Sequence, residues 1–230
     1  MTDKTAIRDA ATVIVLRDRA TTPRVLMGQR GSKAAFMPSM FVFPGGAVDP
    51  GDAEIPLAAP LPALCAGRIS EGVAPEMAQI LPAAAIRELW EETGLILGQP
   101  GTWDGAPDDW QGFAQAGFQP SASALQFVFR AITPPGRPRR FDARFFLVDA
   151  GEVANDLDDF GDNDEELEHL QWIPLSEVRQ FKLPFITQVV LAEIAQRAAD
   201  PSPPASVPFF SNRDEEQTFQ RLHGRPMPQD

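Results

Sequence analysis

One stretch near the middle of the chain, residues 86–94, constrains the fold more than any other. On a helix with about 100° per residue, one face carries Glu88, Glu91 and Glu92. The opposite face carries the residues suited to a core, namely Ile86, Leu89, Trp90 and Thr93. Pro82 suits the first turn and Gly94 the C-cap, which predicts a helix from about Pro82 to Thr93. Such a helix packs on a core and presents its carboxylates outward.

The three carboxylates repel one another at helical spacing unless a cation lies between them. Like charges one turn apart cost a few tenths of a kcal/mol per pair when exposed. Hard divalent ions such as Mg²⁺ and Mn²⁺ take carboxylate oxygens as ligands. The pattern therefore predicts a metal-binding face, and the simpler alternative is a solvated acidic face.

Strand patterns lie on both sides of this helix. Before it, strands are predicted over residues 10–16 and 24–29, joined as an antiparallel hairpin, and residues 40–43 are apolar up to a Pro-Gly-Gly bend. After it, a short helix is expected near Trp110, and strands over residues 125–132, 141–148 and 167–173. Residues 183–199 have the apolar spacing of an amphipathic helix.

Prolines divide the rest of the chain. Residues 50–82 contain six prolines and predict an irregular insert with one or two short helical turns. We expect one domain over residues 1–200, with the insert at about 53–80. The proline-rich segment 201–230 is expected to be an extended or mobile tail unless a partner subunit holds it.

Composition excludes several classes of function. The net charge of −12 disfavours nucleic acid as a partner. The single cysteine, Cys65, allows no internal disulfide and favours the reducing cytoplasm. No apolar run reaches the roughly 18 residues of a membrane span, and no signal peptide is visible. The sequence leaves a homodimer open.

The string Arg-Glu-x-x-Glu-Glu-x-Gly, at residues 87–94, fixes five positions and would arise by chance in roughly one such chain in several thousand. It resembles the second half of the Nudix box. Residues 46–52, which run from Gly46 to Asp52 after Phe-Pro-Gly, resemble its first half. Asp52 stands where that motif usually has Glu. The 34 residues between Asp52 and Arg87 imply an insert of about 27 residues, which costs little loop entropy.

Two further stretches, residues 25–46 and 139–147, are similar to a Nudix branch with a split box that includes a peroxisomal coenzyme A diphosphatase. The resemblance implies an α+β fold, an α/β/α sandwich with a mixed β-sheet flanked by helices. It implies a Nudix hydrolase that uses Mg²⁺ or Mn²⁺ to cleave a diphosphate linkage in a small anionic, nucleotide-like substrate.

The resemblance also implies roles for individual residues. Glu88 and Glu92 would be metal ligands, Glu91 a ligand or the base, and the Gly46 carbonyl a further ligand. Arg87 would orient Glu91, while Asp52 would contact Arg87 or a metal-bound water. A further carboxylate often comes from a distant loop in this family, and the acidic residues 156–168 offer Glu165, Glu166 and Glu168, with Glu166 preferred.

Arginine suits bidentate phosphate contact, and the candidates are Arg30, Arg139, Arg140 and Arg144. Each could equally form a structural ion pair. Coenzyme A or acyl-CoA is the favoured substrate. The alternatives are ADP-ribose, a dinucleotide or another nucleoside diphosphate derivative and, in a different class, a non-catalytic Nudix-fold ligand sensor, which would be expected to lose the metal-binding glutamates.

Overall fold

In the computed structural model, residues 6–34, 36–160, 167–212 and 217–224 are described. Their larger sheet has nine strands. These are β1 (Ile7–Arg17), β2 (Arg24–Arg30), β3 (Phe41–Val42), β4 (Gly45–Ala47), β7 (Gln126–Ile132), β8 (Arg140–Asp149), β9 (Leu167–Pro174), β10 (Val207–Ser211) and β11 (Thr218–Leu222). The helices are α1 (Ala63–Ile69), α2 (Met77–Thr93), α3 (Gln111–Gln115) and α4 (Phe185–Arg197).

The sheet is mixed, and β1 lies near its centre. The strand order is β11-β10-β7-β8-β1-β2-β3, with β4 also paired to β1 and β9 to β2. Strand β1 runs parallel to β8 and antiparallel to β2, so the predicted hairpin is confirmed. Strands β2 and β9 pair antiparallel, with an irregular register between Met27 and Gln29.

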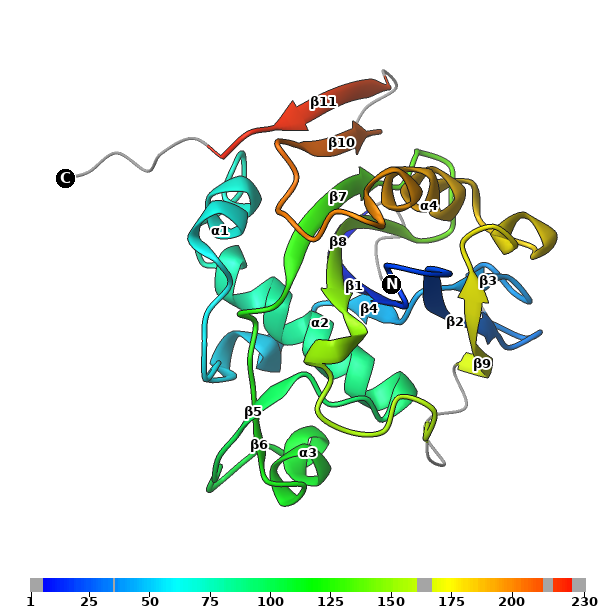
Figure 1. Cartoon of the computed structure of the whole chain (residues 1–230). Coiled ribbons are helices and arrows are strands. Elements are labelled where there is room, and N and C mark those ends of the chain that lie inside the picture. Colours follow the sequence, from blue (N-terminus) through cyan, green and yellow to red (C-terminus); the bar gives the residue numbers. More distant parts are fainter. Residues whose placement is uncertain (1–5, 35, 161–166, 213–216, 225–230) are drawn as a thin grey trace.

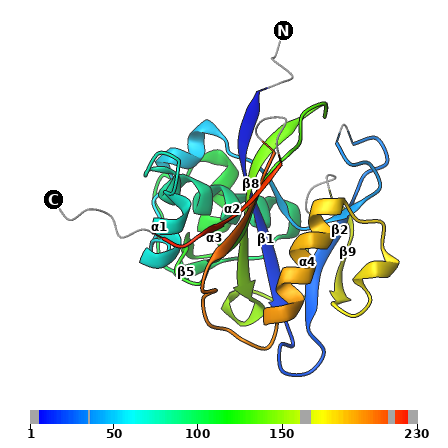
Figure 2. The same ribbon diagram turned by 90° about the horizontal axis from the view of Figure 1, so that it is seen from above.

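Alternation along β1 divides the core into two layers, because successive side chains of a strand point to opposite faces. Ala11, Val13 and Val15 join the cluster that packs against α1 and α2. Ile14 and Leu16 join the cluster that packs against α4. Helices therefore cover both faces of the sheet (Figure 2), and the expected α/β/α sandwich is confirmed.

The helix that carries the acidic face begins earlier than the sequence predicts. Helix α2 starts at Met77, which places Pro82 inside the helix. An internal proline loses a helical hydrogen bond and costs about 3 kcal/mol in an isolated helix. Here Leu81 and the alanines at 83–85 are fully buried, so packing against the sheet offsets that loss. The helix ends as predicted, at Gly94 in the left-handed conformation with φ of 69°.

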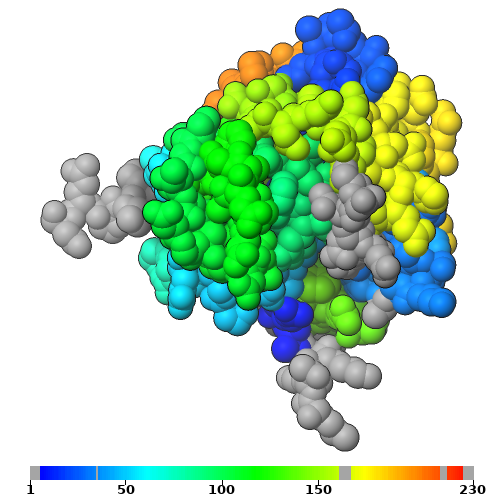
Figure 3. Space-filling view, turned by 90° about the horizontal axis from the view of Figure 1, so that it is seen from below, coloured from blue at the N-terminus to red at the C-terminus, as the bar shows by residue number. Residues whose placement is uncertain are grey.

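The insert and the segment after α2 form ordered elements. The insert contains a 3₁₀ turn (Pro50–Glu54) and α1, which agrees with the predicted short helical turns. Strands β5 (Gly98–Pro100) and β6 (Phe118–Pro120) form a small antiparallel sheet around α3. In Figure 3 the segment from β5 to β6, coloured green, covers part of the face of the molecule that is shown.

The C-terminal segment differs from its prediction. It was expected to be an extended or mobile tail outside the domain, but β10 pairs with β7 and β11 pairs with β10. Figure 1 shows this hairpin extending the main sheet beside α1. Val207 and Leu222 are buried in the core on the α2 side of the sheet, which explains the attachment. Removing these apolar side chains from water lowers the free energy of the folded chain.

The contact between α1 and the C-terminal hairpin is also polar. Arg68 of α1 donates to the carbonyl of Ala205 at 3.0 Å, and Glu71 accepts from the backbone N–H of His223 at 3.0 Å. The insert in the split motif and the end of the chain therefore support each other. No helix among the described residues is long and apolar enough to cross a membrane.

We predict that Val207→Ala lowers the free energy of unfolding by about 2 kcal/mol, since it removes two fully buried carbon groups and leaves a cavity. Phe219→Ala in the same hairpin removes a side chain that is 57 % exposed, and should change that free energy by about 0.5 kcal/mol at most. Urea denaturation compares the two variants. Equal losses would mean that the hairpin is not attached through Val207.

Candidate active site

The two halves of the motif meet through a buried ion pair between Arg87 and Asp52. Arg87 Nε donates to Asp52 Oδ1 at 2.8 Å, and Arg87 Nη2 donates to Oδ2 at 3.1 Å. The Asp52 side chain is 1 % exposed and that of Arg87 is 7 % exposed. The insert between them thus loops out and returns, and the shorter carboxylate Asp52 still makes a bidentate contact.

Local structure aims Asp52 at this contact. It lies in the 3₁₀ turn that follows β4, where its Oδ2 also accepts from the backbone N–H of Asp49 at 2.8 Å. One carboxylate therefore caps its own turn and also holds α2, the helix that carries the second half of the motif. Arg87 closes the connection by donating to the carbonyl of Ala47 in β4 at 3.1 Å.

Arg87 also holds two of the helix carboxylates. Its Nη1 donates to Glu91 Oε2 at 2.8 Å and to Glu88 Oε1 at 3.0 Å. Burial alone would lower the pKa of Arg87, but its hydrogen bonds with Asp52 and the charges of Glu88, Asp52 and Glu91 outweigh burial and raise it. The guanidinium therefore stays charged at every accessible pH.

The Gly45–Gly46 bend brings the backbone against the acidic face. Glu92, which is 3 % exposed, accepts from the backbone N–H of Gly45 at 2.7 Å. Gly45 has φ of 153°, and a Cβ there would lie 2.6 Å from the Cα of Thr12 in β1. A Cβ on Gly46 would lie 2.6 Å from Glu88 Cδ. A side chain at position 45 would collide with the backbone of β1, and one at position 46 would displace the Glu88 carboxylate, so the two glycines let the bend lie against the acidic face.

The site carries more negative than positive charge. Asp52, Glu88 and Glu91 pair with one guanidinium, that of Arg87, and Glu92 of the same helix face accepts from the Gly45 N–H. Burial raises the pKa of Glu91, more than the neighbouring Arg87 lowers it. An excess of oxygen donors and negative charge favours a hard divalent cation.

The carboxylates of α2 point in two directions. Among the described residues, no three His, Cys, Asp or Glu side chains are placed together as metal ligands. Glu88 and Glu91 turn to Arg87, while Glu92 turns to the Gly45 N–H. The donor types and the single helical turn that carries them still fit such an ion, because a cation competes with hydrogen bonds that these flexible side chains can exchange.

Glu88 lines a pocket of about 250 Å³ whose walls also include residues of β1, β8 and α4. The pocket is lined by two of the predicted phosphate ligands, Arg30 and Arg139, and by a third arginine, Arg8, which no sequence pattern singles out. Arg8 was missed because β1 was predicted to begin at residue 10. With β1 starting at Ile7, period-two alternation puts Arg8 on the same side as Ala10 and Thr12, which also line the pocket.

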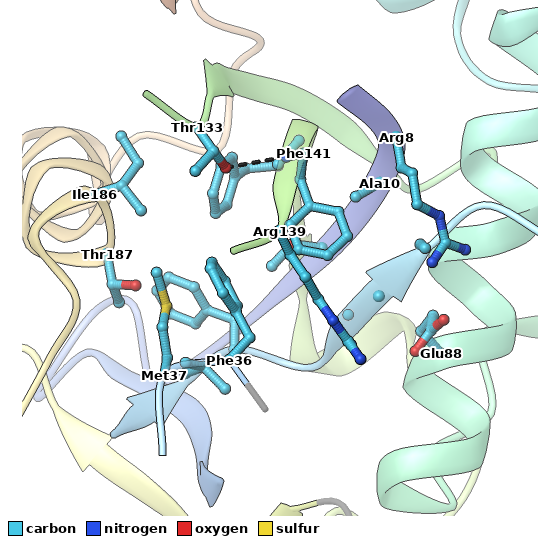
Figure 4. Close-up of a pocket in the computed structure, with 18 of the residues that line it drawn as sticks. Arg8, Ala10, Phe36, Met37, Glu88, Thr133, Arg139, Phe141, Ile186 and Thr187 are labelled. Carbon is cyan, nitrogen blue, oxygen red and sulfur yellow. Dashed lines mark hydrogen bonds between the residues drawn. The ribbon is translucent and has the colours of Figure 1, made fainter. Parts of the chain in front are cut away.

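Arg8 and Arg139 make no hydrogen bond or ion pair with any other described residue, and both are exposed. In Figure 4 their guanidinium groups lie on the same side of the pocket as Glu88. Unpaired cations beside a carboxylate cluster, in a chain of net charge −12, leave this end of the pocket suited to an anion.

The other two predicted phosphate ligands lie elsewhere. Arg144 is fully buried, where it donates to Asp9 and to the Asp142 carbonyl, and burial lowers its pKa. Arg140 donates to the carbonyls of Thr133 and Asn212. Neither lines the pocket. Their positions in β8 make them links between strands, a role that the sequence alone left open.

The acidic segment of residues 156–168, expected to supply a further carboxylate, is described only in part. Glu165 and Glu166 lie outside the described residues. Glu168 is exposed at the start of β9, opposite Gln29 of β2, and does not line the pocket. A carboxylate from this segment therefore stays a prediction.

Comparison with known proteins agrees with the geometry. The NUDIX domain family model matches residues 6–194, which is most of the chain, so the protein belongs to the NUDIX family. The match includes both halves of the motif and the pocket-lining strands β1 and β8.

Two relatives are informative. A Caenorhabditis elegans protein named "Putative nudix hydrolase 7" is 33 % identical over 153 residues, which cover 61 % of this chain and 44 % of that protein. The chain thus matches less than half the length of that relative. The crystal structure of a NUDIX hydrolase from Alicyclobacillus acidocaldarius is 27 % identical, covers 83 % of this chain and 92 % of that one, and has a TM-score of 0.61.

The ion pair yields a stability prediction. Asp52→Asn should lower the free energy of unfolding by about 3 kcal/mol, because it leaves Arg87 buried with a neutral partner. Asp49→Asn is the matched control. Asp49 is 60 % exposed in its side chain and 3.9 Å from Arg87, so its change should stay within about 0.5 kcal/mol. Similar values in urea denaturation would contradict the structural role of Asp52.

Proposed function

We propose that the protein is a metal-dependent Nudix hydrolase that cleaves a diphosphate linkage in a nucleoside diphosphate derivative. The observation that supports this most is that Asp52 and Arg87 join the two halves of the motif, and that Glu88 of the acidic face lines a pocket together with Arg8 and Arg139, which have no partner among the described residues. Members of the NUDIX family generally use divalent metal ions, and Mg²⁺ or Mn²⁺ suits the all-oxygen donor set.

In this proposal Glu88 and Glu92 are metal ligands, together with the Gly46 carbonyl. Bound there, the ion would offset diphosphate charge and lower the pKa of a water. Glu91 serves as a ligand or as the base that takes the proton of the attacking water, and its raised pKa supports the second role. Arg87 is a positioning residue, since it fixes Glu91 through a charge-assisted hydrogen bond. Glu166 remains the proposed carboxylate from the acidic segment.

The phosphates are proposed to bind Arg8, Arg139 and Arg30. Arg8 and Arg139 have no competing partner among the described residues, and a guanidinium can form two parallel hydrogen bonds with a phosphate. Arg140 and Arg144, which the sequence suggested for this role, are proposed instead to stabilise the sheet through the contacts described above.

Coenzyme A or acyl-CoA stays the favoured substrate, on the resemblance of residues 25–46 and 139–147 to the split-box branch. Both stretches line the pocket, through Arg30, Phe36 and Met37 from the first and Arg139 and Phe141 from the second. ADP-ribose, a dinucleotide or another nucleoside diphosphate derivative is the alternative. A non-catalytic sensor is less favoured because the chain keeps all three helix glutamates. The single, buried Cys65 keeps the cytoplasm as the proposed location.

Glu92→Gln tests the catalytic assignment. Glutamine keeps an oxygen that accepts from the Gly45 N–H, so the variant should fold normally. Loss of the charge should lower kcat by about 100-fold or more, since charge stabilisation by a bound ion contributes several kcal/mol. Glu152→Gln, at an exposed site after β8, is the control and should keep full activity. An unchanged kcat in Glu92→Gln would refute the assignment.

The substrate is tested with a panel of coenzyme A, acyl-CoA, ADP-ribose, NADH and nucleoside triphosphates, each with Mg²⁺, Mn²⁺ or EDTA. We expect metal-dependent release of a phosphorylated product, highest for a coenzyme A compound and absent in EDTA. Cleavage of ADP-ribose or NADH instead would select the alternative. No cleavage with either metal, together with measurable binding, would support the sensor.

A further inference from the structure

The pocket beside Glu88 has two chemically distinct ends. Figure 4 shows Arg8, Arg139 and Glu88 grouped at one end, and Met37, Ile186 and Thr187 at the other. The charged end accounts for a diphosphate. Cleavage of a diphosphate does not by itself require the apolar end, which lies on the side of α4, away from Glu88.

The apolar end is built from three separate parts of the chain. Phe36 and Met37 come from the loop after β2, Phe141 from β8 and Ile186 from the first turn of α4. Phe36 packs edge-on against Phe141, with ring centroids 5.4 Å apart. Contacts between distant segments give this wall a defined shape, so that it can discriminate between groups of different size.

Few polar atoms face this end. Of the residues labelled at this end in Figure 4, only Thr133 and Thr187 carry a polar side-chain atom, a hydroxyl in each case, and Thr133 Oγ1 already accepts from the backbone N–H of Phe141 at 3.1 Å. A nucleobase has several nitrogen and oxygen atoms that would go unpaired here at a cost. An aliphatic group has none, and a flexible methionine adapts readily to its outline.

Backbone conformation adds an independent observation. Met37 and Ser39 both have positive φ, 52° and 57°, a region that non-glycine residues seldom occupy. Hydrogen bonds hold the loop in this form: the backbone N–H of Ser39 donates to the Arg30 carbonyl, and Gln29 Nε2 donates to the Ser39 carbonyl. Such strain is concentrated at ligand clamps, where it fixes a side chain in place. Here it places Met37 in the pocket wall.

We infer that the wall of Phe36, Met37 and Ile186 is a subsite for an uncharged aliphatic substituent of the diphosphate substrate. This inference rests on the proposed function for the location of the diphosphate. The pocket volume of about 250 Å³ is below the roughly 300–1,000 Å³ of most ligand pockets, so it encloses part of a large substrate and leaves the rest outside.

The test uses n-alkyl monoesters of methylenediphosphonate, from ethyl to octyl, whose P–C–P bridge resists hydrolysis. Binding is measured by calorimetry in the presence of Mg²⁺. In the wild-type protein the Kd should fall roughly threefold to fourfold for each methylene that enters the apolar end. Arg139→Gln should raise the Kd of every member by the same factor, since it acts at the charged end.

Met37→Gly and Ser39→Gly form a matched pair. Both relieve a positive φ, so both should unfold at the same or a higher urea concentration than wild type. Only Met37→Gly removes a side chain from the pocket, and only it should flatten the dependence of Kd on chain length. Ile186→Ser, on α4, should flatten it as well and provides a variant outside the loop.

The outcomes separate the two proposals. A Kd that is measurable but independent of chain length in the wild type overturns the subsite and leaves the hydrolase intact. Equal behaviour of Met37→Gly and Ser39→Gly also overturns it. A phenyl ester that binds more tightly than the hexyl ester would assign the wall to a flat ring and overturn the aliphatic reading. No binding by any member overturns the diphosphate site itself.

Discussion

The buried pair of Arg87 and Asp52 is the interaction on which the site depends. A guanidinium that is 7 % exposed loses its hydration, and only a full set of partners offsets that cost. The Arg87 guanidinium donates to both carboxylate oxygens of Asp52 and to the Ala47 carbonyl. It also donates to the carboxylates of Glu88 and Glu91. Arg87 therefore joins the 3₁₀ turn that carries Asp52, strand β4 and the acidic helix.

This arrangement explains why an insert is tolerated inside the motif. The constraint is that Asp52 reaches Arg87, and a long loop between them adds little closure entropy. The insert also makes contacts of its own, since Arg68 and Glu71 bind the backbone of the C-terminal hairpin. The segment that interrupts the motif thus attaches the end of the chain to the domain.

The arginines of the domain fall into two groups, those in buried ion pairs and those that line the pocket. Arg130 and Arg144 pair with Asp142 inside the sheet, and Arg87 pairs with carboxylates at the motif. Arg8 and Arg139 have no such partner among the described residues and face the pocket. In an acidic protein this leaves local positive charge where an anionic substrate would approach.

The sequence by itself determined the local features. The period of 3.6 gave the acidic and apolar faces of α2, alternation gave the main strands, and Gly94 gave the end of the helix. Tertiary structure alone decided three others: the start of α2 at Met77, the pairing of β10 with β7, and the entry of Arg8 into the pocket. These depend on burial between residues distant in the chain, and such burial leaves no periodic signal in a single segment.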